Sequence, residues 1–250
     1  IGVGYFGSSN RIPGLNWSAG IMNGLNGAGI SGGTGLRDAR FEGREATMSN
    51  LGTTASMLYF FKGFRFQASG YYGGTIGMTP NAADSLDLDS GPFGTPVGLG
   101  EFNVQFRKNG FQFKALASYV VIPDAERLNR AFATNAPSSM YGYFAEAGYN
   151  VFEKTKWNEK QKQLIVFARY EALDMMATVP ENGIRDEQYK QTYLISGITF
   201  LPVRGVALKF DWKHLTTGEQ NPALVFNPSP NAPAYLPVNN FFQLGMAYSF

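Results

Sequence analysis

Three observations predict that this chain is all-β, an antiparallel up-and-down β-barrel that crosses a membrane with about 10 to 12 strands. Residues 241–250 alternate with period two, because Phe242, Leu244 and Met246 share one face while small or polar residues share the other. The same alternation recurs along the chain between turn residues. The expected turns also divide into a short set and a long set, as the order of the strands shows below.

The composition narrows the class further. Aromatic residues make up 15% of the 250 residues and glycine contributes 30, against 16% charged residues, which favours many strands joined by tight turns. A net charge of +2 without a basic run argues against a nucleic-acid-binding protein. The absence of cysteine excludes a disulfide framework and a thiolate metal site. We therefore expect one domain over residues 1–250, with no cofactor, no metal and no nucleic-acid partner.

The first expected strands flank a region without alternation. Residues 2–6 form the end of a strand, and in 15–24 the side chains of Trp17, Ala19 and Ile21 alternate with polar or small ones. From residue 25 to 52 neither alternate face is apolar, because glycines and then charged residues dominate. A lipid-facing strand is excluded there, since a charge near the bilayer midplane costs about 2 to 4 kcal/mol.

Two hairpins follow. Residues 53–60 turn at 62–63 into 64–73, where Phe64, Phe66 and Tyr72 share one face. Residues 98–107 turn into 111–121 through Asn109 and Gly110, a strong hairpin signal. In both returning strands the aromatic residues point to the face that we expect to meet lipid.

The second half continues the pattern after one helix. Residues 124–134 begin with Asp124 as a helix N-cap and carry a stripe of Leu128, Ala131 and Phe132, so a short loop helix is expected. The strands that follow are 140–151, 164–174, 189–201, whose facing the pattern does not decide, 206–215 and the C-terminal strand after a loop over 217–238.

Loop lengths support a membrane barrel. Counted back from a periplasmic C-terminus, the turns at 62–63, 108–110 and 202–205 lie on the periplasmic side and are short. The connections at 74–97, 122–138, 175–187 and 216–238 lie outside and are long, and 152–162 is intermediate. Membrane barrels show this asymmetry, whereas a soluble sandwich has no reason to.

Four segments carry a resemblance to a known family: Gly35 to Arg44, Leu164 to Glu171, Pro202 to Asp211 and Leu244 to Phe250. They resemble outer-membrane porins of Bacteroidota and proteobacteria, similar to phosphate-selective porins. The resemblance implies a porin of the bacterial outer membrane that lets small hydrophilic solutes diffuse passively. Members of that family are longer, so we expect an N-terminal portion to be absent and about 14 to 16 strands in the complete barrel. The family's phosphate specificity is not carried over, because the chain has no dense ladder of basic residues.

If the apolar faces meet lipid, the opposite faces line a lumen and can select solutes by charge. Pairing of these charges across neighbouring strands is the simpler alternative. Their slight basic excess indicates at most weak anion preference. The candidates for lumen-lining residues are Arg65, Glu101, Arg107, Lys114, Glu146, Arg169, Glu171, Lys209, Asp211 and Lys213.

Residues 26–50 have two interpretations. The favoured one is a loop folded into the lumen that narrows the pore; the other is a polar strand end with an external loop. The glycines do not form a phosphate-binding loop, since no Gly-Lys-Ser/Thr follows. The candidate constriction residues are Arg37, Asp38, Arg40, Glu42, Arg44 and Glu45.

Two further groups of residues favour no second activity. Asp84, Asp87 and Asp89 lack the glycine and glutamate of a calcium loop and are expected to be a solvated acidic loop. His214, the only histidine, has the parity of Trp212 and is expected to be an interfacial anchor rather than a general base.

Passive diffusion is thus the favoured function, with outer-membrane lipid and lipopolysaccharide as surroundings and no catalytic residue. A non-conducting structural or complex-forming barrel is the alternative, and an outer-membrane hydrolase ranks below both. A homo-oligomer or a larger membrane complex stays open.

Overall fold

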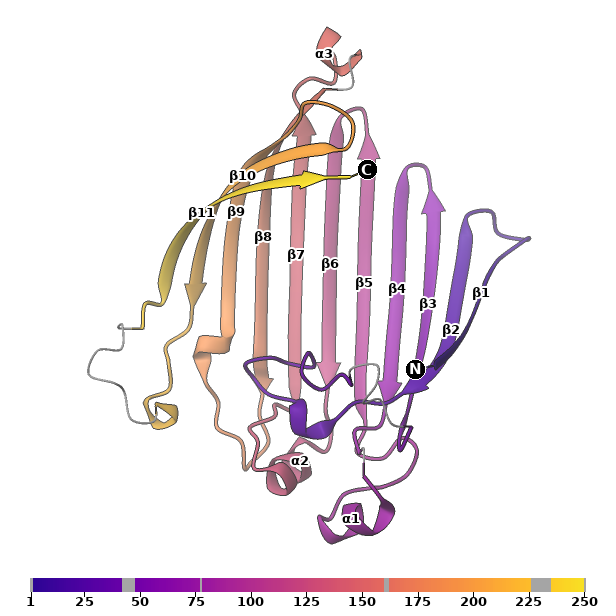
Figure 1. Cartoon of the computed structure of the whole chain (residues 1–250), viewed down its shortest axis with the longest axis vertical. Coiled ribbons are helices and arrows are strands. Elements are labelled where there is room, and N and C mark those ends of the chain that lie inside the picture. The colour runs from indigo at the N-terminus through magenta and orange to yellow at the C-terminus, as the bar shows by residue number, and fades with distance from the viewer. Residues whose placement is uncertain (1, 42–47, 77, 160–161, 226–234, 250) are drawn as a thin grey trace.

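A computed structural model describes residues 2–41, 48–76, 78–159, 162–225 and 235–249. Its framework is one antiparallel sheet of eleven strands in which each strand pairs with its neighbours in sequence (Figure 1). The all-β up-and-down fold is therefore confirmed, and the strand number lies in the expected range. The strands are β1 Gly2–Ser8, β2 Leu15–Asn23, β3 Leu51–Phe61, β4 Phe64–Gly73, β5 Val97–Lys108, β6 Phe111–Val121, β7 Ser139–Asn150, β8 Gln163–Thr178, β9 Lys190–Leu201, β10 Val206–Thr217 and β11 Val238–Tyr248.

The helices lie in the connections. The loop helix expected after Asp124 is confirmed as α2, although the Asp124 side chain makes no capping hydrogen bond. The sequence pattern did not indicate the other short helices. In the described part of the chain no helix is both long and apolar enough to cross a membrane. The helices are η1 Gly27–Gly29, α1 Pro80–Ser85, α2 Ala125–Phe132, α3 Lys156–Glu159, η3 Glu187–Tyr189 and η4 Pro222–Leu224.

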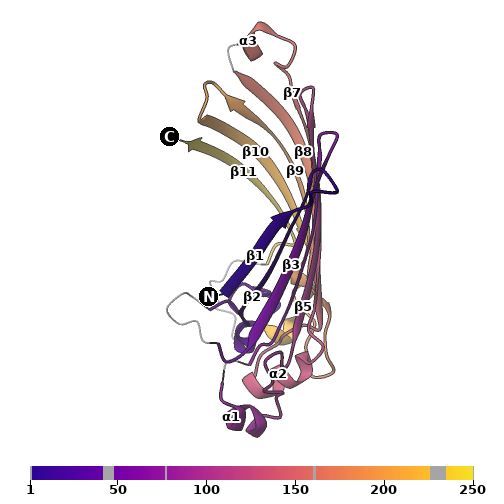
Figure 2. The same ribbon diagram turned by 90° about the vertical axis from the view of Figure 1, so that its right-hand side faces the viewer.

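The sheet is curved like a gutter, with one concave and one convex face (Figure 2). Its edges are β1 and β11, which do not pair with each other among the described residues. Because all neighbouring strands are antiparallel, β1 and β11 run in the same direction. A direct pair between these two edges would consequently be parallel, unlike every other pair in the sheet.

Apart from a register shift between β7 and β8 at the long-loop end, the register assigns the paired strand residues to one face or the other. Directly paired residues point to the same side of a sheet, and one unbroken row joins Ile198 on β9 to Phe210 on β10 and Leu244 on β11. The apolar faces expected for the separate strands all fall on this common, convex side. The row also settles β9, whose facing the sequence left open: Leu194 and Ile198 are exposed on the convex side.

Aromatic residues form two bands on the convex face. Near the short turns, the Phe64 ring lies 5.5 Å from Phe66 and 4.4 Å from Phe106. Nearer the long loops lies a set of tyrosines, with small residues such as Ala115, Ala117 and Ala145 between the bands. Three strands carry one ring of each band six residues apart, about 20 Å along the strand. These ring pairs are Phe66 with Tyr72, Phe113 with Tyr119, and Tyr149 with Tyr143.

The buried apolar core lies at the long-loop end. It joins the starts and ends of strands, such as Val97 and Met140, to loop residues, such as Ile76 and Ile122, and to Leu128 of α2. Through the middle of the sheet the concave face mixes charged and polar side chains with separate apolar ones such as Phe144 and Ile195, and the described core cluster does not extend there. The long connections are thus packed together as a layer at one end of the curved sheet.

Candidate functional site

All ten residues expected to line a lumen lie on the concave face. The paired row Arg65, Gln105, Lys114, Glu146 and Arg169 crosses five consecutive strands from β4 to β8. The remaining candidates share the parity of these residues on their own strands. The sheet therefore gathers onto one surface the charges that the sequence distributes over 149 residues, from Arg65 to Lys213.

Three pairs of opposite charge form on this surface. The Lys114 Nζ lies 3.3 Å from Glu146 Oε1 on the next strand. The other two pairs join residues of a single strand: Arg169 with Glu171 at 2.6 Å, and Lys209 with Asp211 at 3.2 Å. Pairing across neighbouring strands, the alternative raised by the sequence, thus accounts for two of the ten charged residues, and pairing within a strand accounts for four more. Lys114 and Lys209 are about half exposed, and ion pairs that remain open to water on one side contribute little stability.

The other hydrogen bonds of these residues that the structure describes involve neutral partners. Arg65 donates to Gln67 Oε1 at 3.1 Å, and Arg107 donates to Gln163 Oε1 at 3.4 Å. The carboxylate of Glu101 accepts from Ser69 Oγ and Asn103 Nδ2. Because Arg65 and Arg107 have neutral partners, no acidic group among the described residues cancels their positive charge. The surface therefore carries both signs of charge with a small basic excess.

A long excursion of the chain, residues 24–41, crosses the concave face at the long-loop end; we call it the inner segment (Figure 2). It leaves β2 beside the end of β4, where the amides of Leu25 and Gly27 donate to the carbonyls of Gly74 and Thr75 at 2.9 and 2.8 Å. The segment then turns back on itself. The Asn26 amide donates to Ala39 O at 2.7 Å, which joins the outgoing and returning limbs.

The tip of the inner segment rests against β7, β8 and η3. A Cβ atom on Gly32 would lie 2.6 Å from Met176 Sδ, and one on Gly35 would lie 2.5 Å from Met175 Cε. The Tyr189 ring covers Gly33. Glycine at these positions lets the backbone approach the methionine side chains closely, and the segment reaches across from β2 to β8.

The sequence pattern did not indicate one feature of this region. The sequence indicated no apolar face between residues 25 and 52, yet Ile30 and Ala39 are fully buried in the core of the long-loop end. Leu25 and Leu36 pack against the same core. The physical reason is that a folded loop buries side chains at irregular intervals, whereas the alternation test detects only the regular spacing of a strand.

The constriction candidates are only partly described. Arg37, Asp38 and Arg40 are exposed on the returning limb, and Arg40 Nε donates to Arg37 O at 3.4 Å. Glu42, Arg44 and Glu45 lie outside the described residues. None of the ion pairs among the described residues involves Arg37, Asp38 or Arg40.

Polar contacts join the loops around the inner segment. Arg185 donates to Asp174 at 3.0 Å and to Glu187 at 2.5 Å, and its hydrogen bond with Glu187 is the main reason why the Glu187 pKa lies below its ordinary value. Asn135 and Ile184 exchange two hydrogen bonds between the loop after β6 and the loop after β8. The long-loop end is therefore braced by side chains from several connections.

The remaining candidates take local roles. Asp87 pairs with Arg130 of α2 at 3.5 Å, and Asp89 accepts from the Gly91 amide at 3.1 Å. His214 lies on the convex side, with its ring 5.8 Å from Trp212 and its Nδ1 3.0 Å from Asn240 Oδ1. The described residues contain no cluster of three or more His, Asp or Glu side chains arranged to hold a metal ion.

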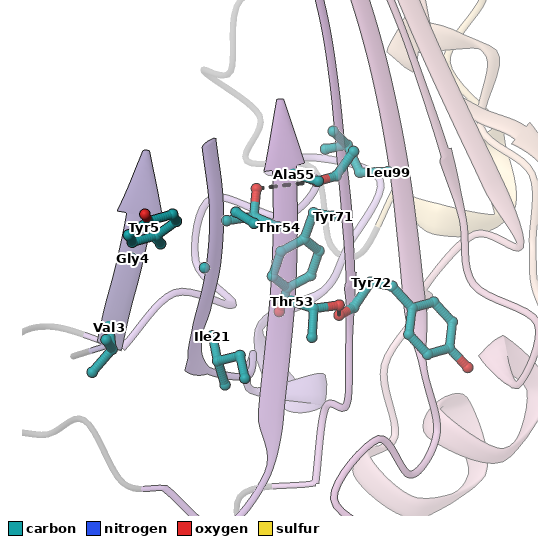
Figure 3. A pocket seen from close by; sticks show the side chains of 13 residues that line it. Val3, Gly4, Tyr5, Ile21, Thr53, Thr54, Ala55, Tyr71, Tyr72 and Leu99 are labelled. Carbon is teal, nitrogen blue, oxygen red and sulfur yellow. Dashed lines mark hydrogen bonds between the residues drawn. The ribbon is translucent and has the colours of Figure 1, made fainter. Parts of the chain in front are cut away.

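Two cavities lie near the β1 edge. One, of about 720 Å³, is lined by Val3, Tyr5, Ile21, Tyr72 and other residues of β1 to β5, none of them charged (Figure 3). The other, of about 370 Å³, lies between the inner segment and the concave wall. Sequence reasoning missed the second cavity, because it forms only when the inner segment folds over strands that follow it in the chain.

Comparison with known proteins relates the chain to porins by fold. No family model matches it, and no curated protein sequence does. A porin structure refined at 1.8 Å resolution superposes with a TM-score of 0.51 at 11% identity, over 100% of this chain and 61% of the porin. OmpF of Salmonella typhi, in a complex with daunomycin, gives a TM-score of 0.51 at 11% identity, over 87% of this chain and 54% of OmpF. The chain thus spans less than two thirds of these porins and has their antiparallel up-and-down fold.

The close approach of the two limbs generates a test of the inner segment. A Cβ on Gly29 would lie 2.5 Å from the Asp38 carbonyl carbon, a backbone atom, so Gly29→Ala must separate the limbs. We expect hydrogen exchange of the Asn26 and Ile30 amides to be at least about tenfold faster, equivalent to ~1.4 kcal/mol of local stability. Gly33→Ala is the matched control, because its Cβ would meet Tyr189 at an ordinary 3.4 Å. Equal exchange in both variants would show that the limbs do not pack as described.

Proposed function

We propose that this protein is an outer-membrane porin through which small hydrophilic solutes diffuse passively with weak charge preference. The observation that carries the proposal is the two-sided sheet: an apolar convex face with two aromatic bands, and a concave face with charges of both signs. The fold shared with porins supports the same function. No catalytic role is assigned to any residue.

The convex face suits a bilayer. Exposed apolar side chains cover it from β1 to β11, including Phe102, Tyr143, Phe210 and Leu244, and a continuous apolar surface of this extent marks a membrane or protein contact. The aromatic bands, about 20 Å apart along the strands, favour the bilayer, since membrane barrels carry an apolar belt of about 25 Å between aromatic girdles. Ten of the strands have nine residues or more, long enough for tilted transmembrane strands.

The concave face suits an aqueous path. Its charged rows would run along the pore wall, and the inner segment would narrow the pore at the long-loop end, with Arg37, Asp38, Arg40, Glu42, Arg44 and Glu45 at the constriction. The position of the described part of this segment, across the concave face from β2 to β8, supports that assignment. Three local ion pairs leave a small basic excess, which supports a slight anion preference.

The finer assignments are part of the proposal. The family is the group of Bacteroidota and proteobacterial porins that the sequence resembles, and the surroundings are outer-membrane lipid and lipopolysaccharide. A closed barrel would have about 14 to 16 strands. A non-conducting structural barrel is the second candidate, favoured by the packed layer of long loops that covers one mouth of the sheet.

The lipid-facing side can be tested with one charge placed on either face of β6. Ala117 lies on the convex face between Phe113 and Tyr119, whereas its neighbour Ser118 faces Glu101 across the concave side. In lipid bilayers Ala117→Arg should lower the free energy of unfolding by about 2 to 4 kcal/mol, because the guanidinium would enter hydrocarbon. Ser118→Arg should cost under ~1 kcal/mol, since it gains an acidic partner. Similar losses of unfolding free energy in the two variants would contradict the assignment of the convex face to lipid.

Passive diffusion is tested by recording the purified protein in planar bilayers. Stepwise, ohmic conductance with a small anion preference is the expected result, since the concave charges leave a basic excess. The same preparation must first show folded β-structure by circular dichroism. A folded sample that stays silent would refute diffusion in favour of the structural barrel, and turnover of lipid or peptide substrates would refute the non-enzymatic assignment.

The constriction is tested by replacing Arg37, Arg40 and Arg44 together with Ala. The acidic residues of the segment would lose their compensation in a narrow, weakly screened space, so the reversal potential should shift toward cation preference. The barrel should fold normally, because Arg37 and Arg40 are exposed and form no described ion pair. The control is Arg130→Ala in α2, outside the pore wall. Unchanged selectivity in the triple variant would show that the segment does not bound the pore.

A further inference from the structure

We propose that the cavity beneath the inner segment binds amphipathic organic anions, with an apolar body inside and an acidic group at Arg40. This inference names a class of solute that the pore retains and so deepens the proposed function. The role of the site in transport rests on that proposed function. The cavity has about 370 Å³, within the range of small-molecule sites.

The wall and roof of the cavity are mostly apolar, with Asn23 as a neutral polar residue at the end of β2. Met22 of β2, Tyr71 of β4 and Leu99 of β5 form the wall on the concave side, and Leu36 and Phe41 come from the returning limb. Figure 3 shows Tyr71 and Leu99 on neighbouring strands. A hydrocarbon or aromatic body of matching size would replace water against these side chains, at about 25 cal/mol per Å² of apolar surface buried.

Two features of the fold keep this space unfilled. Gly52 on β3 has no side chain, and the Tyr71 ring lies over it: a Cβ there would be 2.7 Å from both Tyr71 Cε2 and Oη. The inner segment is held above the wall by its bonds to Gly74 and Thr75 and by its packed tip. The cavity therefore lies between strand residues on one side and the anchored inner segment on the other.

Arg40 fixes the sign of the ligand. It is the only charged residue among those that line the cavity in the described part of the chain. Its side chain is exposed, and its one described hydrogen bond is the long one from Nε to Arg37 O. The guanidinium has further donors with the geometry to bind a carboxylate, sulfonate or phosphate. An anion with an apolar body can pair with Arg40 and also contact the apolar wall, whereas an inorganic anion can only pair with Arg40.

The probe is 2-naphthalenesulfonate, with 2-naphthalenemethanol as its neutral analogue and methanesulfonate as the anion without the ring. Binding is measured by fluorescence anisotropy of the naphthalenes on the intact protein in lipid nanodiscs, with empty nanodiscs subtracted, and by competition for methanesulfonate. The wild type should bind naphthalenesulfonate at least about tenfold more tightly than either analogue, because only it uses both parts of the site.

Two pairs of variants test the two parts. Arg40→Gln should weaken naphthalenesulfonate about tenfold and leave the neutral analogue unchanged. Arg37→Gln removes the same charge from the same limb but from outside the cavity, and should shift ion preference alone. Gly52→Ala should displace the Tyr71 ring and weaken both naphthalenes, whereas Gly70→Ala, whose Cβ would meet only Leu99 O at 3.7 Å, should not.

Equal weakening by Arg37→Gln and Arg40→Gln would overturn the site in favour of a diffuse positive field, and so would equal affinities of naphthalenesulfonate and methanesulfonate. Bilayer recordings separate this inference from the proposed function. Binding with no conductance would refute diffusion and leave the site standing, whereas conductance without binding or current block would refute the site alone.

Discussion

The structure depends on the unbroken ladder of backbone hydrogen bonds that joins β1 to β11. In a bilayer each unpaired backbone donor or acceptor costs several kcal/mol, so strands can cross it only when every neighbour is paired. The ladder meets this demand at all ten contacts between consecutive strands. In the described part of the chain, the outer edges of β1 and β11 have no neighbouring strand. These two strands run in the same direction. Closure with antiparallel pairs alone therefore requires an odd number of additional strands between them.

The ladder also creates the two surfaces. A register fixed by short turns keeps each side chain on its face, since a slip of one residue would carry every charge of a strand to the convex side. The turns at Lys62–Gly63 and Asn109–Gly110 meet this need with backbone in the left-handed region: φ is 47° and 87° in the first, 50° and 78° in the second. The concave charges and the convex aromatic bands are thus one consequence of the same pairing.

At the long-loop end a different principle operates. There the chain buries apolar side chains against one another, as a soluble protein does, with Ile30 of the inner segment and Leu128 of α2 in one core. Glycines make the close contacts possible, because Gly29 and Gly32 leave no room for a Cβ beside Asp38 and Met176. This packing holds the inner segment across the concave face, and the cavity above Met22 and Leu99 is the space left beneath it.

Much of the fold could be predicted from the sequence, because a half-apolar strand has a local signature. Period-two alternation and turn residues such as Asn109–Gly110 located the eleven strands to within a few residues, and the stripe after Asp124 located α2. The parity of Arg65, Lys114 and Arg169 against their aromatic neighbours placed them opposite the apolar face. These features depend on residues two to four positions apart, so the chain carries them without any tertiary information.

Only the tertiary structure decided which residues meet across the sheet. The facing of β9 became clear from its pairing with β8 and β10, and the burial of Ile30 and Ala39 from contacts with loops distant in sequence. The cavity at Arg40 combines side chains from β2, β4, β5 and the inner segment. The sequence by itself determined the strands, their two faces and the order of the turns, since those follow from local periodicity. The path of the inner segment and the site beneath it required the fold, because irregular packing between distant residues leaves no periodic trace in the chain.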